Sequence, residues 1–409
     1  MKFIKTKKEF ILPFLISALP IVAVFCSEKI LSPFIFFVVF TALFEKNKLS
    51  NFRKNKLFLK PYLIFVIFCV IASILSSDFF SSIKALERYI SLILIPIVLF
   101  SSDLTEKRTR FVLQSYVLIM LLVSLFSVGK LIWFVYTFED WIEVMRGVNK
   151  NDTYLQFKYP HLMWDVHPSY WSYLIIIVNI ILLGSKNCFS KLFGKHITIL
   201  LLLAFNINLF YLAARIPLLV NLCVHLIYIT FYFRKNTKYL LATYAIVLLI
   251  LVVTYFQLPF LRYKIEHIKS DERFFLWPIV YENAKANYFV WGEGFGLGGK
   301  FIKNKLTTIS DIRTQYKGNE IHNQYLTMLL ETGILGVFML LYVYIKPAFT
   351  FVEKHKKTLS LSMISLCLLV ILASTIEPFF RVIKGIVIFA VFSALFRLAH
   401  EQKRVRTKI

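Results

Sequence analysis

The strongest constraint on this chain is a series of apolar runs, each about as long as a bilayer is thick. A helix needs ~20 mainly apolar residues to cross the hydrocarbon core of a membrane. Reading the sequence for such runs gives twelve segments, near 9–26, 30–44, 61–78, 86–101, 111–136, 169–184, 196–213, 216–233, 239–260, 323–345, 358–376 and 383–399. The sequence therefore predicts an all-α polytopic membrane protein with about twelve transmembrane helices.

Composition supports this class, since 58% of the residues are apolar and only 17% are charged. A soluble domain has to cover its surface with more polar groups than that. The formal charge of +25 would ordinarily suggest a nucleic-acid partner, but such binding needs the basic residues on one water-facing patch. Here they are dispersed, so we expect membrane lipids as partners and no nucleic acid.

The basic residues alternate along the chain and so predict its orientation. Lys and Arg accumulate in short cytoplasmic loops, and every second gap between the predicted helices is basic. These stretches hold more than half of the 48 Lys and Arg residues, among them Lys2–Lys8, Lys46–Lys60, Lys107–Arg110, Lys186–Lys195, Arg234–Lys238, Lys346–Lys357 and Arg397–Lys408. Both termini are therefore expected in the cytoplasm.

Two long segments fall on the opposite, outer side, at 137–168 and 261–322. Long connections between packed elements are commonly binding or lid segments. We expect a single transmembrane domain over 1–409, with its function concentrated in these two segments and the main site in the second. The five cysteines are scattered, so they predict neither a disulfide nor a metal site, and no cleavable signal peptide is evident.

Three arginines at outer helix ends are candidate anion ligands, because charges near membrane depth are costly. Arg215 lies in a tight apolar turn, where it either extends to the lipid head groups or grips phosphate oxygens with its planar fork of donors. Arg273 belongs either to a solvated helix face or to the same anion site. Arg88 is the weakest of the three, because Glu87 and Lys84 beside it would also explain it as part of an interfacial charged cluster.

His322 is the best candidate for acid–base chemistry. It lies where a polar segment turns into the tenth apolar run, and a histidine at such a boundary can accept a proton near neutral pH. Glu320 or Glu331 are candidates to orient it, although Glu331 would lie more than two helical turns deeper.

Two other outer stretches are less specific. His167, with His161 and Asp165, resembles a set of metal ligands, but its spacing fits no standard pattern and no metal is expected. The glycine-rich stretch 291–299, which includes Glu293, lacks the strand-turn-helix context of a nucleotide loop and is interpreted as a flexible turn.

The run His322-Asn323, nine further residues, then Gly333 and Gly336 resembles the His-[Asn/Ser/Gln]-x9-Gly-x-x-Gly signature of bacterial O-antigen ligases. The wider superfamily also contains O-antigen polymerases and protein O-oligosaccharyltransferases. About twelve spans, an arginine before a span and a long outer loop ending at the histidine are similar too. Ala214 departs from the pattern, since many relatives have serine there.

The resemblance implies a metal-independent, C-type (GT-C) glycosyltransferase of the bacterial inner membrane, with its site facing the periplasm and no cofactor. Its donor would be a glycan on undecaprenyl diphosphate, and its acceptor a lipid A-core sugar or another glycan. His322 would be the general base of an inverting transfer, with Arg215, Arg273 and Arg88 on the diphosphate. His167, Asn323 and Glu293 are candidates for acceptor binding or supporting roles.

Two other classes remain as alternatives. A transporter or lipid-glycan flippase also has many spans, but carriers tend to show paired halves and charges near mid-membrane. A pure membrane scaffold would leave the histidine–glycine pattern without a reason.

Overall fold

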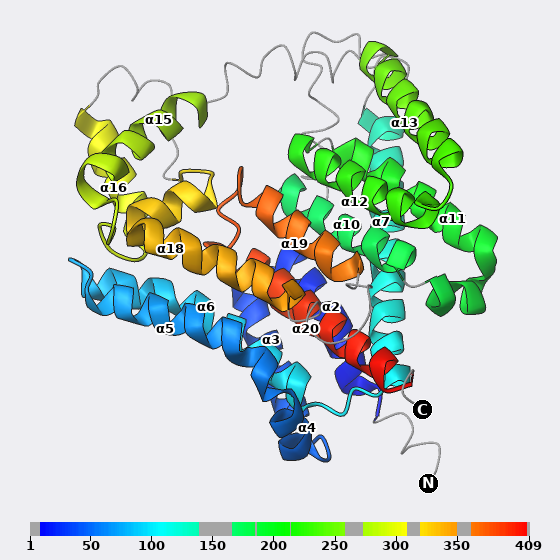
Figure 1. Ribbon diagram of the computed structural model, residues 1–409, viewed down its shortest axis with the longest axis horizontal. Helices are drawn as coiled ribbons and strands as arrows, with labels where there is room; N and C mark the ends of the chain where they lie inside the picture. The colour runs from blue at the N-terminus through cyan, green and yellow to red at the C-terminus, as the bar shows by residue number, and fades with distance from the viewer. Residues whose placement is uncertain are drawn as a thin grey trace. The chain divides into compact units, whose positions relative to one another are not determined.

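The computed structural model describes residues 9–138, 166–184, 186–212, 214–257, 273–308, 320–349 and 361–406. Within these ranges the regular structure is helical, and no β-strand occurs (Figure 1). Each of the twelve predicted apolar runs contains a helix, which confirms the all-α prediction. These helices are α2 (Ile11–Phe25), α3 (Glu28–Leu43), α5 (Lys60–Ile74), α6 (Phe79–Ser101), α7 (Glu106–Phe138), α10 (Pro168–Gly184), α11 (Lys186–Leu212), α12 (Arg215–Phe233), α13 (Thr237–Gln257), α18 (Gln324–Phe349), α19 (Leu361–Ala373) and α20 (Ile383–Arg406).

The remaining helices lie outside those runs. Two of them, α4 (Lys48–Asn55) and the 3-10 helix η1 (Lys56–Leu59), precede α5, and α15 (Arg273–Asn283), the π-helix η3 (Ala284–Tyr288) and α16 (Gly298–Thr308) precede α18. The described part of the second long outer segment is thus largely helical. The first, 137–168, falls mostly outside the described residues.

Six helical stretches among the described residues are long and apolar enough to cross a membrane: Lys48–Ile74, Glu106–Lys130, Gly194–Leu212, Arg215–Phe233, Gln324–Ala348 and Ile383–Glu401. Large apolar side chains also face outward, as on α3, where Phe36 is 71% exposed, and directly after it, where Phe44 is 72% exposed. Such faces are stable against lipid rather than water. The chain is thus a multi-pass membrane protein, and the count of twelve spans stays a prediction.

The chain folds into two compact units. Unit 1 consists of Met1–Ser115 with Glu272–Ile409, and unit 2 consists of Tyr116–Asp271. Helix α7 begins in unit 1 and ends in unit 2. That 1–409 acts as one transmembrane domain stays a prediction.

Unit 1 is built around α20, whose residues from Ile386 to Leu398 are almost all buried. Helix α20 packs against α6, α2 and α19, while α5 packs against both α6 and α18. Helices apolar on all sides are typical of the interior of a helical membrane protein. The packing brings α18, from a distant part of the sequence, beside α5, which packs in turn against α6 (Figure 1).

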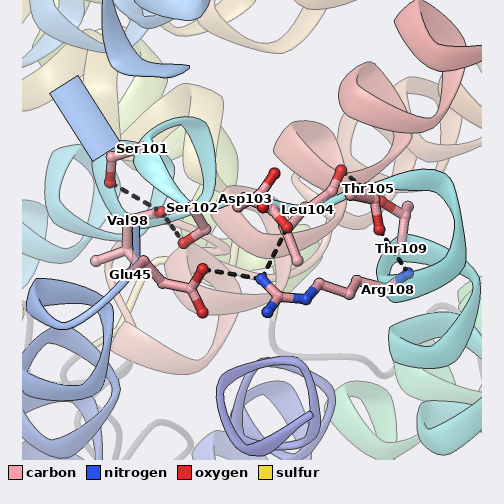
Figure 2. Close-up of polar contacts among 9 residues, drawn as sticks. All are labelled: Glu45, Val98, Ser101, Ser102, Asp103, Leu104, Thr105, Arg108 and Thr109. Atoms are coloured by element: carbon pink, nitrogen blue, oxygen red, sulfur yellow. Dashed lines mark hydrogen bonds and ion pairs between the residues drawn. The ribbon is translucent and has the colours of Figure 1, made fainter. Parts of the chain in front are cut away.

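One end of unit 1 is fastened by a polar cluster between α3, α6 and α7 (Figure 2). Arg108 donates from Nη1 to Glu45 Oε2 and to the Asp103 carbonyl, both at 2.9 Å. Ser102 donates to the Val98 carbonyl at 2.5 Å. Arg108 and Glu45 side chains are 13% and 11% exposed, so this ion pair is less screened than a surface pair.

Two further segments of unit 1 that the charge pattern assigns to the cytoplasm, Lys46–Lys60 and the start of Arg397–Lys408, contact the same end. Asn55 donates to the Phe100 carbonyl at 3.2 Å, and the Arg397 guanidinium lies 3.7 Å from the centre of the Phe58 ring. At the other end of unit 1, the turn between α5 and α6 contacts the segment 295–300, and Arg88 contacts the turn between α19 and α20, as described below. Unit 1 therefore separates its loops as the alternating charge predicts, and which end faces the cytoplasm stays a prediction.

Unit 2 has α10 at its centre, with α11 and α12 packed against it. Nearly every residue of α10 from Ser169 to Leu182 is buried. Asn179 of α10 donates to Asn221 Oδ1 at 2.9 Å, and Asn221 donates to Asn206 Oδ1 at 2.7 Å. Such amide chains hold helices together where water is absent.

Candidate functional site

His322 lies immediately before α18 in a backbone conformation that is unusual for a histidine. Its φ is 50°, in the left-handed region, which costs ~1–3 kcal/mol and persists only where neighbours enforce it. The preceding Ile321 is fully buried, and its carbonyl accepts from Trp277 Nε1 at 2.9 Å. The strained residue is thus held from its N-terminal side, with the half-buried imidazole at the helix entry.

Asn323 holds His322 from the other side because it caps α18. Its Oδ1 accepts from the backbone N–H groups of Tyr325 at 2.9 Å and Leu326 at 3.0 Å. These are the second and third residues of the helix, whose amides have no partner within it. The polar residue after the histidine therefore fixes the start of the helix and supports His322.

Helix α18 is broken at Gly333, where φ is 68° and ψ is −168°. In a continuous helix the Ile334 N–H would donate to the Leu330 carbonyl. Here Ile334 donates instead to the Phe289 carbonyl at 2.8 Å, and the Leu330 carbonyl accepts from the Glu293 N–H at 2.8 Å. The segment 289–293 is thus inserted into the helical hydrogen-bond ladder.

Two glycines allow this close crossing of backbones. A Cβ on Gly333 would overlap the backbone of Val290 and Trp291, and a Cβ on Gly292 would overlap the backbone of Glu331. Both residues also have positive φ, which glycine adopts without steric cost. The interpretation of 291–299 as a flexible turn is therefore wrong, because its backbone is bonded to α18.

Glu331 fastens the same glycine-rich segment by its side chain. The carboxylate accepts from the Gly298 N–H, the first residue of α16, at 3.0 Å. It therefore caps α16 from a neighbouring helix, at the helix end that favours negative charge. The second motif glycine, Gly336, has a different reason for lacking a side chain, since a Cβ there would overlap the Thr332 side chain. Glu331 thus supports the loop, and its predicted role in orienting His322 stays a prediction.

The turn between α5 and α6 joins this assembly. Ser82 donates to the Phe295 carbonyl at 2.6 Å, and Lys300 of α16 lies 3.1 Å from Asp78 Oδ2. The Ser81 hydroxyl and backbone N–H, together with Lys300, lower the pKa of Asp78 to about 2. Asp78 is therefore ionised at neutral pH and caps α6 by accepting from Ser81 N at 3.1 Å.

Glu293 has the opposite environment. Burial raises the pKa of its carboxyl, the nearby Glu331 adds to this effect, and Lys300 opposes it. Its Oε2 is buried and accepts no hydrogen bond from any described residue. A half-buried carboxyl with a raised pKa is suited to hydrogen bonding with hydroxyl groups.

Arg88 reaches the neighbourhood of His322 through the turn that joins α19 and α20. Its Nη1 donates to the Arg381 carbonyl at 2.8 Å. Gln324, two residues after His322, accepts through Oε1 from the N–H groups of Phe380 at 2.8 Å and Arg381 at 3.2 Å. One buried glutamine thus ties the histidine segment to the turn that Arg88 contacts.

Arg273 begins α15, and the packing of this helix brings it toward the same end. Trp277, one helical turn later, bonds to Ile321, while Leu276 and Val280 pack in a cluster with Ile321 and Leu330. Residues four apart lie on one helix face, so Arg273 shares the face of Trp277. Five of the predicted site residues thus belong to unit 1, together with the two motif glycines Gly333 and Gly336. The five are His322, Asn323, Glu293, Arg88 and Arg273.

Arg215 and His167 belong to unit 2. Arg215 is the exposed first residue of α12, preceded by Ala214, which makes no side-chain cap. His167 is exposed directly before α10, and its Nδ1 accepts from the Ser169 N–H at 3.3 Å. A cation at a helix N-terminus opposes the helix dipole. Arg215 therefore does not stabilise its own helix. An anion bound there would be favoured both by the guanidinium and by the backbone N–H groups at the start of α12.

Sequence reasoning missed Arg381, Gln324 and the supporting role of Glu331. A signal for Arg381 was present, because Glu377 and Arg381 interrupt an apolar sequence in a short outer turn, as Arg215 does. Among the described residues no group of three His, Cys, Asp or Glu side chains could hold a metal ion. His161 and Asp165 lie outside that part of the chain.

The comparison with protein families identifies one domain. Residues 198–341 match the family model described as O-antigen ligase. The matched range contains Arg215, Arg273, Glu293, His322 and both motif glycines, and it leaves out Arg88, His167 and Arg381. A search of curated proteins gave no match. The predicted resemblance is confirmed for this part of the chain: residues 198–341 of this multi-pass membrane protein form a domain of the O-antigen ligase family, a family of membrane enzymes that transfer glycans.

Proposed function

We propose that this protein is an O-antigen ligase of the bacterial inner membrane, which transfers a whole glycan from undecaprenyl diphosphate to a lipid A-core sugar on the periplasmic side. The observation that carries the proposal is the strained His322, fixed between Ile321 and Asn323 inside the matched domain. Strained residues concentrate at functional sites. An imidazole at a polar helix entry has the chemistry that activation of a sugar hydroxyl requires.

His322 acts as the general base in an inverting transfer. An imidazole nitrogen takes the proton of the acceptor hydroxyl while that oxygen forms a bond to the anomeric carbon of the donor. The bond between this carbon and the diphosphate oxygen breaks on the opposite face, and undecaprenyl diphosphate leaves with the electron pair. Such a base contributes ~10²–10⁴-fold to the rate.

Arg215, Arg273 and Arg88 bind the diphosphate and stabilise the charge that grows on it during bond cleavage. Both Arg215 and Arg273 are first residues of helices, so each guanidinium lies beside backbone N–H groups that also favour an anion. Glu293 and His167 are assigned to the acceptor, and Asn323 to support of His322. The mechanism needs no metal or other cofactor.

Two related enzymes share these catalytic groups. An O-antigen polymerase would use another lipid-linked repeat unit as acceptor, and a protein O-oligosaccharyltransferase would use a protein hydroxyl. The acceptor depends on the shape of the outer segments. A transporter or flippase is less supported, because carriers tend to show paired halves and the two halves of this chain differ greatly in loop length.

Deletion of the gene, followed by electrophoresis of the lipopolysaccharide, distinguishes these enzymes. Loss of all long chains, with undecaprenyl-linked polymer still accumulating, supports the ligase. A core with one repeat unit indicates a polymerase, and an unchanged ladder points to protein glycans or another polysaccharide. Complementation with wild type should restore the ladder, whereas His322→Ala and Arg215→Ala should not, at normal protein level.

A further inference from the structure

The turn 374–382 between α19 and α20 holds one arginine whose backbone and side chain have different surroundings. The Arg381 N–H donates to Gln324 Oε1 at 3.2 Å, and its carbonyl accepts from Arg88 at 2.8 Å. Gln324 is itself fixed, because its N–H donates to the Ser374 carbonyl at 2.8 Å. The main chain of the turn therefore does not depend on the Arg381 side chain.

The Arg381 side chain is half-buried, and one nitrogen of its guanidinium is enclosed. Its Nη1 is buried and forms no hydrogen bond with any described residue, and no described acidic side chain forms an ion pair with it within 4.0 Å. A buried cation costs several kcal/mol unless an anion compensates it. An anion that reached this nitrogen would therefore satisfy both its charge and its hydrogen bonding.

The carboxylate that acts on Arg381 through space is Glu331. That carboxylate is already used, since Oε1 accepts from the Gly298 N–H at 3.0 Å. Arg381 could thus be a distant counter-charge for Glu331, or a ligand for an anion that enters from outside. The two roles predict different donor binding in a double variant that lacks both the Arg381 and the Glu331 charges.

The position of Arg381 favours a substrate anion. Its backbone is bonded to Gln324, which is two residues from His322, and to the exposed Arg88. These contacts place Arg88, the backbone of Arg381 and the segment of the candidate base at one end of unit 1, and both arginines also act on Glu331 through space. Paired arginines bind phosphate oxygens strongly through forked, charge-assisted hydrogen bonds.

We propose that Arg381 is a substrate-binding residue that, together with Arg88, holds phosphate oxygens of the lipid-linked diphosphate donor. The inference rests on the proposed function, and it assigns to this site a residue outside the matched family domain. Arg381 holds the leaving group on the face of the anomeric carbon opposite the acceptor hydroxyl, and its loss weakens donor binding more than the chemical step.

The test uses the full-length protein in detergent with two readouts. In the transfer assay, Arg381→Gln should raise KM for the donor ~10–100-fold, the loss expected for a charge-assisted contact, with KM for the acceptor unchanged. Arg381→Lys should recover part of the loss. Inorganic diphosphate should raise the thermal unfolding midpoint of wild type, and this shift should shrink in Arg381→Gln.

Two controls separate this proposal from its alternatives. Arg110→Gln, at the other end of unit 1, should match wild type. If Arg381 only compensates Glu331, the double variant with Glu331→Gln should recover donor binding, and that recovery would overturn the proposal. Unchanged donor KM and unchanged diphosphate stabilisation in Arg381→Gln would also overturn it. A third outcome separates the two proposals. If wild type transfers no glycan, and diphosphate stabilises wild type but not Arg381→Gln, the proposed function is contradicted and this inference is supported.

Discussion

At the scale of single residues, the polar end of unit 1 contains two carboxyl groups with opposite tendencies. The pKa of Asp78 is lowered to about 2 by Ser81 and Lys300, whereas burial raises the pKa of Glu293. Lys300 acts on both, which places the two carboxyl groups in one electrostatic network. Asp78 contributes stability above its ordinary pKa of ~3.9, and this contribution is lost as pH falls toward 2.

Glu293 should make the protein less stable as pH rises. Its folded-state pKa lies above the ordinary value of ~4.3, so the folded protein holds the proton more tightly. The associated stability is present below ~4.3 and is lost as pH rises through the raised pKa. Glu293→Gln should therefore raise the thermal unfolding midpoint at pH 8 and change it little at pH 4.

Thermal unfolding of the detergent-solubilised protein at the two pH values measures this difference. Glu282→Gln, an exposed glutamate on α15, serves as the matched control and should give no such pH dependence. An equal shift at both pH values for Glu293→Gln would contradict the assignment of its environment.

The histidine–glycine pattern can be explained residue by residue, but only with the structure in hand. Sequence reasoning predicted that His322 stands at a polar helix entry, and it is found directly before α18. It could not predict the exchange of hydrogen bonds at Gly333, because the partner is a loop some forty residues earlier in the chain. Arg381 was missed for the same reason, since its neighbours Gln324 and Arg88 are distant in sequence.

At the scale of secondary structure elements, apolar length predicted the helices well. The run 323–345 corresponds to α18, and the run 383–399 to α20. The helices α15 and α16 were not predicted, because at 11 residues each they are shorter than a membrane-spanning run. Their buried residues pack in one core with residues of α18. The interpretation of 291–299 failed because glycine content alone does not distinguish a mobile turn from a backbone crossing.

The break in α18 gives a prediction at this scale. Gly333→Ala places a Cβ against the backbone of Val290 and demands a φ of 68° from a residue that rarely adopts it. Strain of this kind costs ~1–3 kcal/mol, and the overlap adds to it. We expect a clearly lowered thermal unfolding midpoint, together with faster proteolysis of the segment 289–300 that crosses the helix.

Gly129 provides the control for this substitution. It lies in the exposed part of α7 with no atom within 4 Å of an added Cβ. Gly129→Ala should be neutral or stabilising by up to ~1 kcal/mol, because alanine is the better helix former. Equal behaviour of the two variants would show that the backbone crossing at Gly333 contributes nothing.

At the scale of the whole molecule, the alternating charge and the contacts of unit 1 agree on which loops share an end. Arg108 with Glu45, and Arg397 with Phe58, join loops that the positive residues assign to one side. Lys300 with Asp78, and Arg88 with Arg381, join loops assigned to the other. The division of loops could thus be predicted from sequence, while the placement of each site residue required tertiary contacts.

The orientation can be measured with single cysteines in a background that lacks the native ones. Phe80, 84% exposed beside Asp78, is predicted to face the periplasm, and Leu57, 73% exposed, the cytoplasm. A membrane-impermeant maleimide added to intact cells should label Phe80→Cys and should label Leu57→Cys only after lysis. The reverse pattern would contradict the positive-inside assignment.

The central claim is that His322 is the base of a glycan transfer, and a reconstituted reaction tests it most directly. Purified protein in vesicles is mixed with an undecaprenyl diphosphate-linked glycan and a lipid A-core acceptor, and the ligated product is measured. His322→Asn is the informative variant, because asparagine tolerates the left-handed backbone at φ 50° but cannot accept the proton. His196→Asn, an exposed histidine on α11, is its control. We expect wild type and His196→Asn to form product and His322→Asn to lose at least ~10²-fold in rate; undiminished transfer by a folded His322→Asn would contradict the claim.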